Sequence, residues 1–153
     1  MGLFDIFKKK EESTPRQLKT EEFLVVGINY YEKNLKKLAV SNKDWKSRTS
    51  TLVKDGKSGT NIFRYDFINK PVKLVPEPKN KNDKNAVQVI IAGELVGYIS
   101  REENIHVKNI LSKNEVKYIS SFISGGEYKV VSENNDVYKS EYSIKITVKI
   151  GYV

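Results

Sequence analysis

The chain has 153 residues, with 27 lysines and arginines against 19 aspartates and glutamates, so its formal net charge is +8. It has no cysteine, which excludes disulfides, thiolate chemistry and cysteine-based zinc sites. No apolar run approaches the roughly 20 residues of a membrane span, so we expect a cytoplasmic protein without stable membrane insertion. The charge favours an anionic partner such as nucleic acid, although a generally lysine-rich surface explains it as well.

Residues 1–20 are predicted to be a separate amphipathic and linker segment, followed by one domain at residues 21–153. The apolar side chains that can share one face of a short helical turn are Leu3, Phe4, Ile6 and Phe7. Such an end can touch a membrane surface or a partner protein. A frayed terminus, or a small cap on the domain, is the alternative interpretation.

The first half of the domain mixes strand and helix patterns. Residues 23–31 are β-branched and aromatic, which favours a strand. Apolar residues at helical spacing predict a helix over 31–39. Ser41 or Asn42 can cap a second helix that carries Trp45. Further strands are predicted at 62–67 and 71–75, on either side of a turn at Asn69.

The second half is richer in strand signals. A β-hairpin is predicted over residues 85–100, with its turn at 92–94. Ser100 and Glu103 have the spacing of a capping box, which predicts a helix over 101–112. Strands at 115–123 and 127–131 are expected on either side of a turn at Gly125 and Gly126, with a loop at 133–136. Strict alternation over 141–153 predicts a final, half-buried strand.

Many short strands and one capped helix predict a mainly β domain with helical insertions. We expect a small OB-like or SH3-like barrel, with the capped helix after the central hairpin. Barrels of this kind bind ligands with one sheet face and the adjoining loops.

Catalytic chemistry has little support in the residues. His106 is the one histidine and is expected at the surface, without a partner base for nucleophilic catalysis. Asp66, Glu77 and Asp83 could bind Mg²⁺, but no spacing pairs them. We therefore expect no enzyme, no cofactor and no metal site, with a metal-dependent nuclease as the alternative. Nine tyrosines and six phenylalanines among many cations suit single-stranded nucleic acid, although ordinary core packing also accounts for them.

Three segments carry a resemblance to a known family: V-V-G-I-N-Y-Y, then E-P-K-N-K-N-D-K-N-A-V-Q-V, then V-G-Y-I-S-R-E. Together they resemble the HIRAN domain, which occurs at the N-terminus of certain Swi/Snf-type helicases and as a stand-alone protein of bacteria and phages. The resemblance spans Phe23–Leu111, and the insertion Ser41–Asn61 is unlike the helicase versions.

The resemblance implies an OB-like barrel that grips the 3′ end of single-stranded DNA. Tyr30 would then stack on a base, Asp83 would accept hydrogen bonds from the terminal 3′ hydroxyl, and Arg101 would hold a phosphate. Tyr98 and Phe122 are the further pocket residues that it implies. The function expected from it is non-catalytic DNA binding in repair or replication-associated processes.

The pattern departs from the helicase form at Asn29, which replaces an arginine, and at Asn82, which replaces a tyrosine. Asp83 can instead hold the loop, because Asx side chains bond neighbouring backbone N–H groups. Lys84, like the other lysines of this loop, can face a phosphate backbone or only water. The alternative function is a protein-interaction module that recruits a helicase, a nuclease or a membrane partner.

Overall fold

The computed structural model describes residues 15–68 and 70–153, so the predicted apolar face of residues 3–7 and the turn at Asn69 lie outside the described residues. In chain order the elements are β1 (Lys19–Val26), the 3-10 helix η2 (Ile28–Tyr31), α1 (Glu32–Leu38), β2 (Ala39–Ser41), α2 (Lys43–Lys46), α3 (Thr49–Lys54), β3 (Ile62–Phe63), β4 (Tyr65–Phe67), β5 (Val72–Pro76), β6 (Val87–Ile91), β7 (Glu94–Ile99), α4 (Asn104–Lys113), β8 (Val116–Val131) and β9 (Val137–Tyr152). Within these two ranges no helix is long and apolar enough to cross a membrane.

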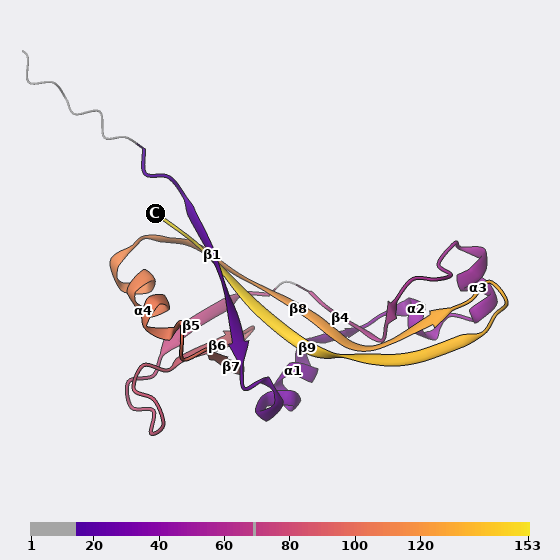
Figure 1. The fold of residues 1–153 in the computed structure, drawn as a ribbon, viewed down its shortest axis with the longest axis horizontal. Helices are drawn as coiled ribbons and strands as arrows, with labels where there is room; N and C mark the ends of the chain where they lie inside the picture. Colours follow the sequence, from indigo (N-terminus) through magenta and orange to yellow (C-terminus); the bar gives the residue numbers. More distant parts are fainter. Residues whose placement is uncertain (1–14, 69) are drawn as a thin grey trace, which may run out of the picture.

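Seven strands form one antiparallel sheet in the order β3-β8-β9-β1-β7-β6-β5, and β2 pairs with β4 in a separate ribbon. The mainly β prediction is confirmed. The two outermost strands, β3 and β5, do not pair with each other over the described residues, so the sheet is open where a closed barrel was expected. Strands β8 and β9 make a long hairpin that crosses the molecule from α4 to α2 and α3 (Figure 1).

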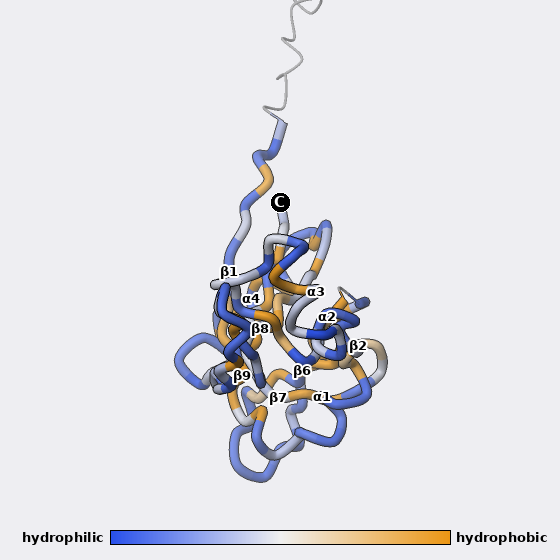
Figure 2. Tube along the Cα trace, turned by 90° about the vertical axis from the view of Figure 1, so that its right-hand side faces the viewer, coloured by the Kyte–Doolittle hydropathy of each residue, from blue (hydrophilic) through white to orange (hydrophobic). Residues whose placement is uncertain are grey.

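The main core lies between one face of the sheet and the helices α1 and α4. Phe23 and Val25 of β1 are each 3% exposed, and Val107 and Ile110 of α4 are buried in the same cluster. Figure 2 shows hydrophilic loops around this hydrophobic interior. A smaller cluster of Leu52, Ile62 and Val131 lies at the far end of the β8–β9 hairpin. Each buried aliphatic side chain contributes about 1.5–3 kcal/mol, so this small cluster fixes α3 against the hairpin.

Several local predictions are confirmed. The helix expected over 31–39 is α1, and the cap expected at Asn42 is present, because its side chain accepts a hydrogen bond from the backbone N–H of Asp44. The β6–β7 hairpin turns through Ala92 and Gly93, both with positive φ, as a tight two-residue turn requires.

Other local predictions are wrong. The strand expected to continue to residue 31 ends at Val26, because Gly27 has φ 77° and is the N-cap of the 3-10 helix η2. The turn expected at Gly125 and Gly126 is absent, and β8 runs straight through both glycines. They have φ of 100° and 96° and lie at a register shift, which is the bulge that glycine permits within a strand.

The prediction of a capping box at Ser100 and Glu103 is also wrong. Residues 101–103 form turns, and α4 begins at Asn104 without a side-chain cap. The backbone carbonyl of Ser100 accepts the N–H groups of Glu103 and Asn104, at 3.0 and 2.9 Å. The main chain therefore supplies the bonds that the Ser100 side chain was expected to make.

Candidate nucleic-acid interface

The loop between β5 and β6 is held by its own asparagine and aspartate side chains. Its base is closed by a 2.8 Å bond from the Glu77 N–H to the carbonyl of Ala86. Asn80 Oδ1 accepts the N–H groups of Asn82 and Asp83, at 2.9 and 3.0 Å. Asx side chains stabilise turns in this way, and they give the polar corner a defined shape without a buried core.

Asp83 joins this loop to the start of α4. Its Oδ1 accepts the N–H of Asn85 at 2.9 Å, and its Oδ2 accepts the side-chain amide of Asn104 at 2.8 Å. The Nε atom of Arg101 lies 3.9 Å from Oδ2, and another guanidinium nitrogen donates to the carbonyl of Asn82 at 3.3 Å. Asn82, Asp83 and Arg101 therefore form one cluster.

The charge state of Asp83 follows from these contacts. The Asn85 N–H has the largest effect and lowers the pKa of Asp83; burial opposes it, and the Asn104 amide and the Arg101 guanidinium lower the pKa further. Asp83 is therefore ionised at neutral pH and accepts hydrogen bonds without donating any. The side chain of Arg101 is 72% exposed, so it can still reach a phosphate.

Tyr98 lies beside the base of the same loop. Its hydroxyl donates to Glu77 Oε2 at 2.8 Å, and Gln88 donates to the same oxygen at 3.1 Å. Burial, and then this bond to Glu77, raise the pKa of Tyr98 to about 12. The Tyr98 ring also packs against Tyr31, with centroids 6.3 Å apart. Tyr98 is thus a half-buried support rather than a free stacking surface.

The two exposed aromatic candidates are Tyr30 and Phe122. Tyr30, in η2, is 82% exposed, and its neighbour Asn29 is also exposed. Phe122, in the middle of β8, is 67% exposed. A phenylalanine this exposed within a sheet is unusual.

Strand register places Phe122 and Tyr98 on the same side of the sheet. Phe122 is paired with Thr147, Thr147 with Leu24, and, two residues further along β1, Val26 with Tyr98. Paired residues and residues two apart share a face. This outer face is opposite the core and comprises Leu24, Val26, Tyr98, Phe122, Lys145, Thr147 and Lys149.

The predicted site residues thus form three groups. Asn82, Asp83 and Arg101 are in contact, and Lys84 is exposed on the same loop. Tyr98 reaches that loop through Glu77. Tyr30 and Asn29 lie in η2, next to β7, whereas Phe122 is three strands away from Tyr98 on the outer face.

Three supporting residues were missed as site residues. Glu77 was predicted only as a possible metal ligand, and Asn104 and Tyr31 were not singled out. A helical Asn104 carries no local signal, because its buried contact with Asp83 spans 21 residues of sequence. Among residues 15–68 and 70–153, no three histidine or acidic side chains are grouped as a metal site would need.

Comparisons with known proteins place this arrangement in a family. No curated protein matches the chain. A solved structure described as the crystal structure of the HIRAN domain of human HLTF is 18% identical, with a TM-score of 0.43, and the match covers 87% of this chain and 74% of that one. The family model for the HIRAN domain matches residues 19–152, well beyond the resemblance at residues 23–111. The chain therefore belongs to the HIRAN domain family, a family of DNA-binding domains.

Proposed function

We propose that this protein binds single-stranded DNA without cleaving it, with the strand on the outer face and its 3′ end at the β5–β6 loop. The observation that carries the proposal is the exposure of Tyr30 and Phe122, at 82% and 67%. Aromatic side chains left in solvent beside cations are the usual stacking platforms for unpaired bases.

The outer face supplies the cations. Lys145 and Lys149 lie two residues on either side of Thr147, the cross-strand partner of Phe122. Lys149 has one weak partner, Glu22, at 3.7 Å. A strand that stacks a base on Phe122 therefore has positive charge on both sides for its phosphates.

The β5–β6 loop suits a terminal hydroxyl. Ionised Asp83 accepts a hydrogen bond from a hydroxyl but repels a terminal phosphate. Each of its two oxygens accepts one hydrogen bond from the described part of the chain, and a carboxylate oxygen can accept more than one bond. Arg101, beside it, is placed to hold the phosphate before the terminal sugar. Asn29 and Asn82, which replace an arginine and a tyrosine of the helicase form, reduce the number of contacts available.

The biological setting that we propose is DNA repair or replication. A domain that binds without catalysis needs a helicase or nuclease partner to act on the bound strand. A domain that recognises the 3′ end of a strand would direct such a partner to free 3′ ends.

Fluorescence anisotropy of the purified chain tests the proposal. The probes are one labelled single strand with a free 3′ hydroxyl, the same strand with a 3′ phosphate, and a blunt duplex, each at two salt concentrations. We expect the free hydroxyl to bind best. Asp83→Asn, which keeps the size of the side chain, should remove the preference between the two single strands while leaving general affinity.

Two results would count against the proposal. Equal, weak and salt-sensitive binding to all three probes would reduce the affinity to nonspecific charge attraction, and would favour the protein-interaction function instead. An unchanged hydroxyl preference in Asp83→Asn would remove the end-reading role from this loop. Incubating each probe with Mg²⁺ and examining its length tests the non-catalytic part, because shortened strands would contradict it.

A further inference from the structure

We infer that the far end of the β8–β9 hairpin carries a second binding site for single-stranded DNA, centred on Trp45, Arg64 and Tyr65. The inference rests on the proposed function, because it extends the path of the same strand. We call this end the arm; it comprises residues 41–65 and 125–143. In Figure 1 the helices α2 and α3 of the arm lie at the opposite end of the molecule from α4 and the β5–β6 loop.

The arm has a hollow of about 260 Å³ with a basic and aromatic lining. The lining residues are Ser41, Asn42, Trp45, Lys46, Arg64 and Tyr65. Two of these six are cations and none carries a carboxylate. The Arg64 guanidinium lies 5.3 Å from the centre of the Tyr65 ring, and that ring is 42% exposed. A planar base can stack on Tyr65 while Lys46 holds a phosphate. One guanidinium nitrogen of Arg64 is bonded to Glu127 at 2.8 Å, and its other N–H groups can contact a second phosphate.

Trp45 has an unusual concentration of positive charge behind it. The amino groups of Lys129 and Lys139 lie 5.5 and 5.6 Å from the centre of its ring. Lys129 is only 7% exposed and donates to the Trp45 carbonyl at 2.8 Å. Neither lysine forms an ion pair within the described part of the chain. Lys139 lines a neighbouring hollow and Lys129 is buried, so the two lysines add positive potential around Trp45 without lining the smaller hollow themselves.

The nearby acidic groups are mostly neutralised. Glu127 is paired with Arg64 at 2.8 Å, and Asp44 with Lys57 at 2.5 Å. Glu141 lines a neighbouring hollow of about 620 Å³ that shares Trp45 and Arg64 with the first. Because Glu141 and Glu127 both belong to that larger hollow, we assign the strand to the smaller one.

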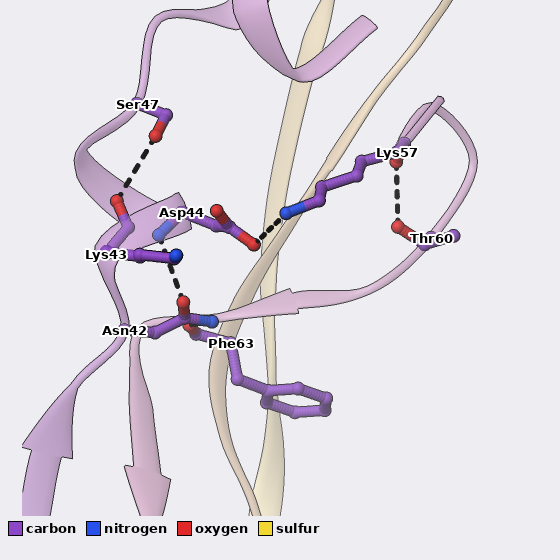
Figure 3. A network of polar contacts seen from close by, with 7 residues as sticks. All are labelled: Asn42, Lys43, Asp44, Ser47, Lys57, Thr60 and Phe63. Carbon is purple, nitrogen blue, oxygen red and sulfur yellow. Dashed lines mark hydrogen bonds and ion pairs between the residues drawn. The ribbon is translucent and has the colours of Figure 1, made fainter. Parts of the chain in front are cut away.

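The short helix that carries Trp45 is held in place before any ligand binds. Figure 3 shows Asn42 bonded to the N–H of Asp44 and to the carbonyl of Phe63, with Lys57 reaching Asp44. These contacts tie α2 to β3 and to the loop after α3. Preorganisation of this kind reduces the ordering that binding would otherwise require.

The spacing of the two regions sets a length requirement. Along β8, Phe122 of the outer face and Tyr128 of the arm are six residues apart, or about 20 Å at 3.3 Å per residue. A strand of a few nucleotides can therefore occupy one region, while a longer strand can reach both.

The chain has a single tryptophan, so the intrinsic fluorescence of Trp45 reports on the arm alone. We would titrate the full-length chain with labelled oligothymidylates of about 5 and about 20 nucleotides, recording anisotropy and tryptophan emission together. We expect the longer strand to change Trp45 emission with the same midpoint as the anisotropy, and to bind at least tenfold more tightly than the shorter one.

Variants separate the arm from the first region. Lys46→Gln combined with Arg64→Gln should weaken the longer strand about fivefold or more and reduce the salt slope by about 1.4, since each phosphate contact of a single strand contributes about 0.7. Tyr65→Ala should weaken it by a similar factor. Lys54→Gln removes a charge from α3 outside the hollow and should change neither readout. Thermal melting of each variant confirms that the arm is folded.

Two results would overturn the inference, and they differ. Anisotropy binding with unchanged Trp45 emission, and with wild-type affinity in the double variant, would leave the proposed function standing and remove the arm site. No anisotropy change with any strand would remove both.

Discussion

The Oδ2 atom of Asp83 and the side-chain amide of Asn104 are 2.8 Å apart, and this hydrogen bond joins the β5–β6 loop to the first turn of α4. Asn104 is only 2% exposed, so its amide depends on this partner. This polar loop is thereby attached to a buried residue at the start of α4, next to the exposed Arg101.

The Asn104 contact should be measurable as stability. Asn104→Ala removes the bond and leaves a gap beneath the loop, so we expect the free energy of unfolding to fall by about 1 kcal/mol. Urea unfolding followed by circular dichroism measures it. Asn109→Ala, an exposed asparagine on the same helix, should stay within about 0.5 kcal/mol. Equal losses in the two variants would show that the Asp83 contact is not the cause.

Acid should weaken the loop through Asp83. The pKa of Asp83 in the folded chain is below its ordinary value of 3.8, chiefly because of the bond from the Asn85 N–H. A lowered folded-state pKa stabilises the protein above the unfolded-state value, and this stabilisation disappears as the pH falls through the folded-state pKa. We therefore expect the urea midpoint to fall below pH 3.8, and to fall less steeply in Asp83→Asn.

Glu21 is a second group to control in that experiment, and Glu115, whose pKa is lowered by its bond from Lys117, is a third. The pKa of Glu21 is lowered by the Tyr152 hydroxyl and by His106, so Glu21 adds acid sensitivity of the same sign. In the double variant Asp83→Asn, Glu21→Gln, the urea midpoint should depend on pH even less than in the single variant. If the urea midpoint of both variants fell with acid as steeply as that of the wild type, Asp83 and Glu21 would not be the cause of the acid sensitivity.

Gly97 should tolerate no side chain. A Cβ there would lie 2.5 Å from the carbonyl oxygen of Val26 and 2.7 Å from a methyl group of Val25. Gly97→Ala should lower the free energy of unfolding by about 1–3 kcal/mol. Gly59 also has positive φ, but a Cβ there would meet nothing within 4 Å, so Gly59→Ala is the control. A comparable loss of stability in Gly59→Ala would mean that backbone strain, rather than the clash, is responsible.

Arg101 should contribute one phosphate contact. Arg101→Gln is expected to weaken single-stranded DNA of any sequence and to reduce the slope of affinity against salt by about 0.7. Lys113→Gln makes the same charge change at the other end of α4 and should leave the slope unaltered. Anisotropy titrations at several salt concentrations measure both, and matching slopes in the two variants would argue against a local contact.

Phe122 should matter for binding and not for folding. Because the ring is 67% exposed, Phe122→Ala should change stability little, yet the loss of one stacked base should weaken DNA binding about fivefold or more. Ile105→Ala, at 57% exposure on α4, is the matched control. Wild-type affinity in Phe122→Ala would place the strand elsewhere.

Local patterns predicted much of the fold for a physical reason. Helix α1, the Asn42 cap, the β6–β7 hairpin and the alternating strand β9 each depend on residues close together in the chain. The E-P-x-N-x-x-D-x-N-A-V block also predicted its loop from local residues alone, because its Asx side chains bond backbone groups two or three residues away. The same block indicated the family.

The failures have identifiable causes. Gly125 and Gly126 have turn composition, but pairing with β9 continues on both sides of them, so they form a bulge within β8. Ser100 and Glu103 have capping-box spacing, but the Ser100 carbonyl takes the N–H groups instead. Pairing with a distant strand decided the conformation of the glycines, whereas a competing backbone bond within the same turn decided that of the cap.

The sequence by itself determined the family, the strand-rich composition, the positive charge and the candidate residues at the β5–β6 loop, because these depend on residue identity and short spacing. Tertiary structure decided that the sheet is open, that Phe122 and Tyr98 share an outer face, and that Asp83 meets Asn104. It also gathered Trp45, Lys129 and Lys139 at the end of the arm. Each of these depends on which distant strands pair and in which register, and a shift of one residue along a strand would turn its side chains to the opposite face.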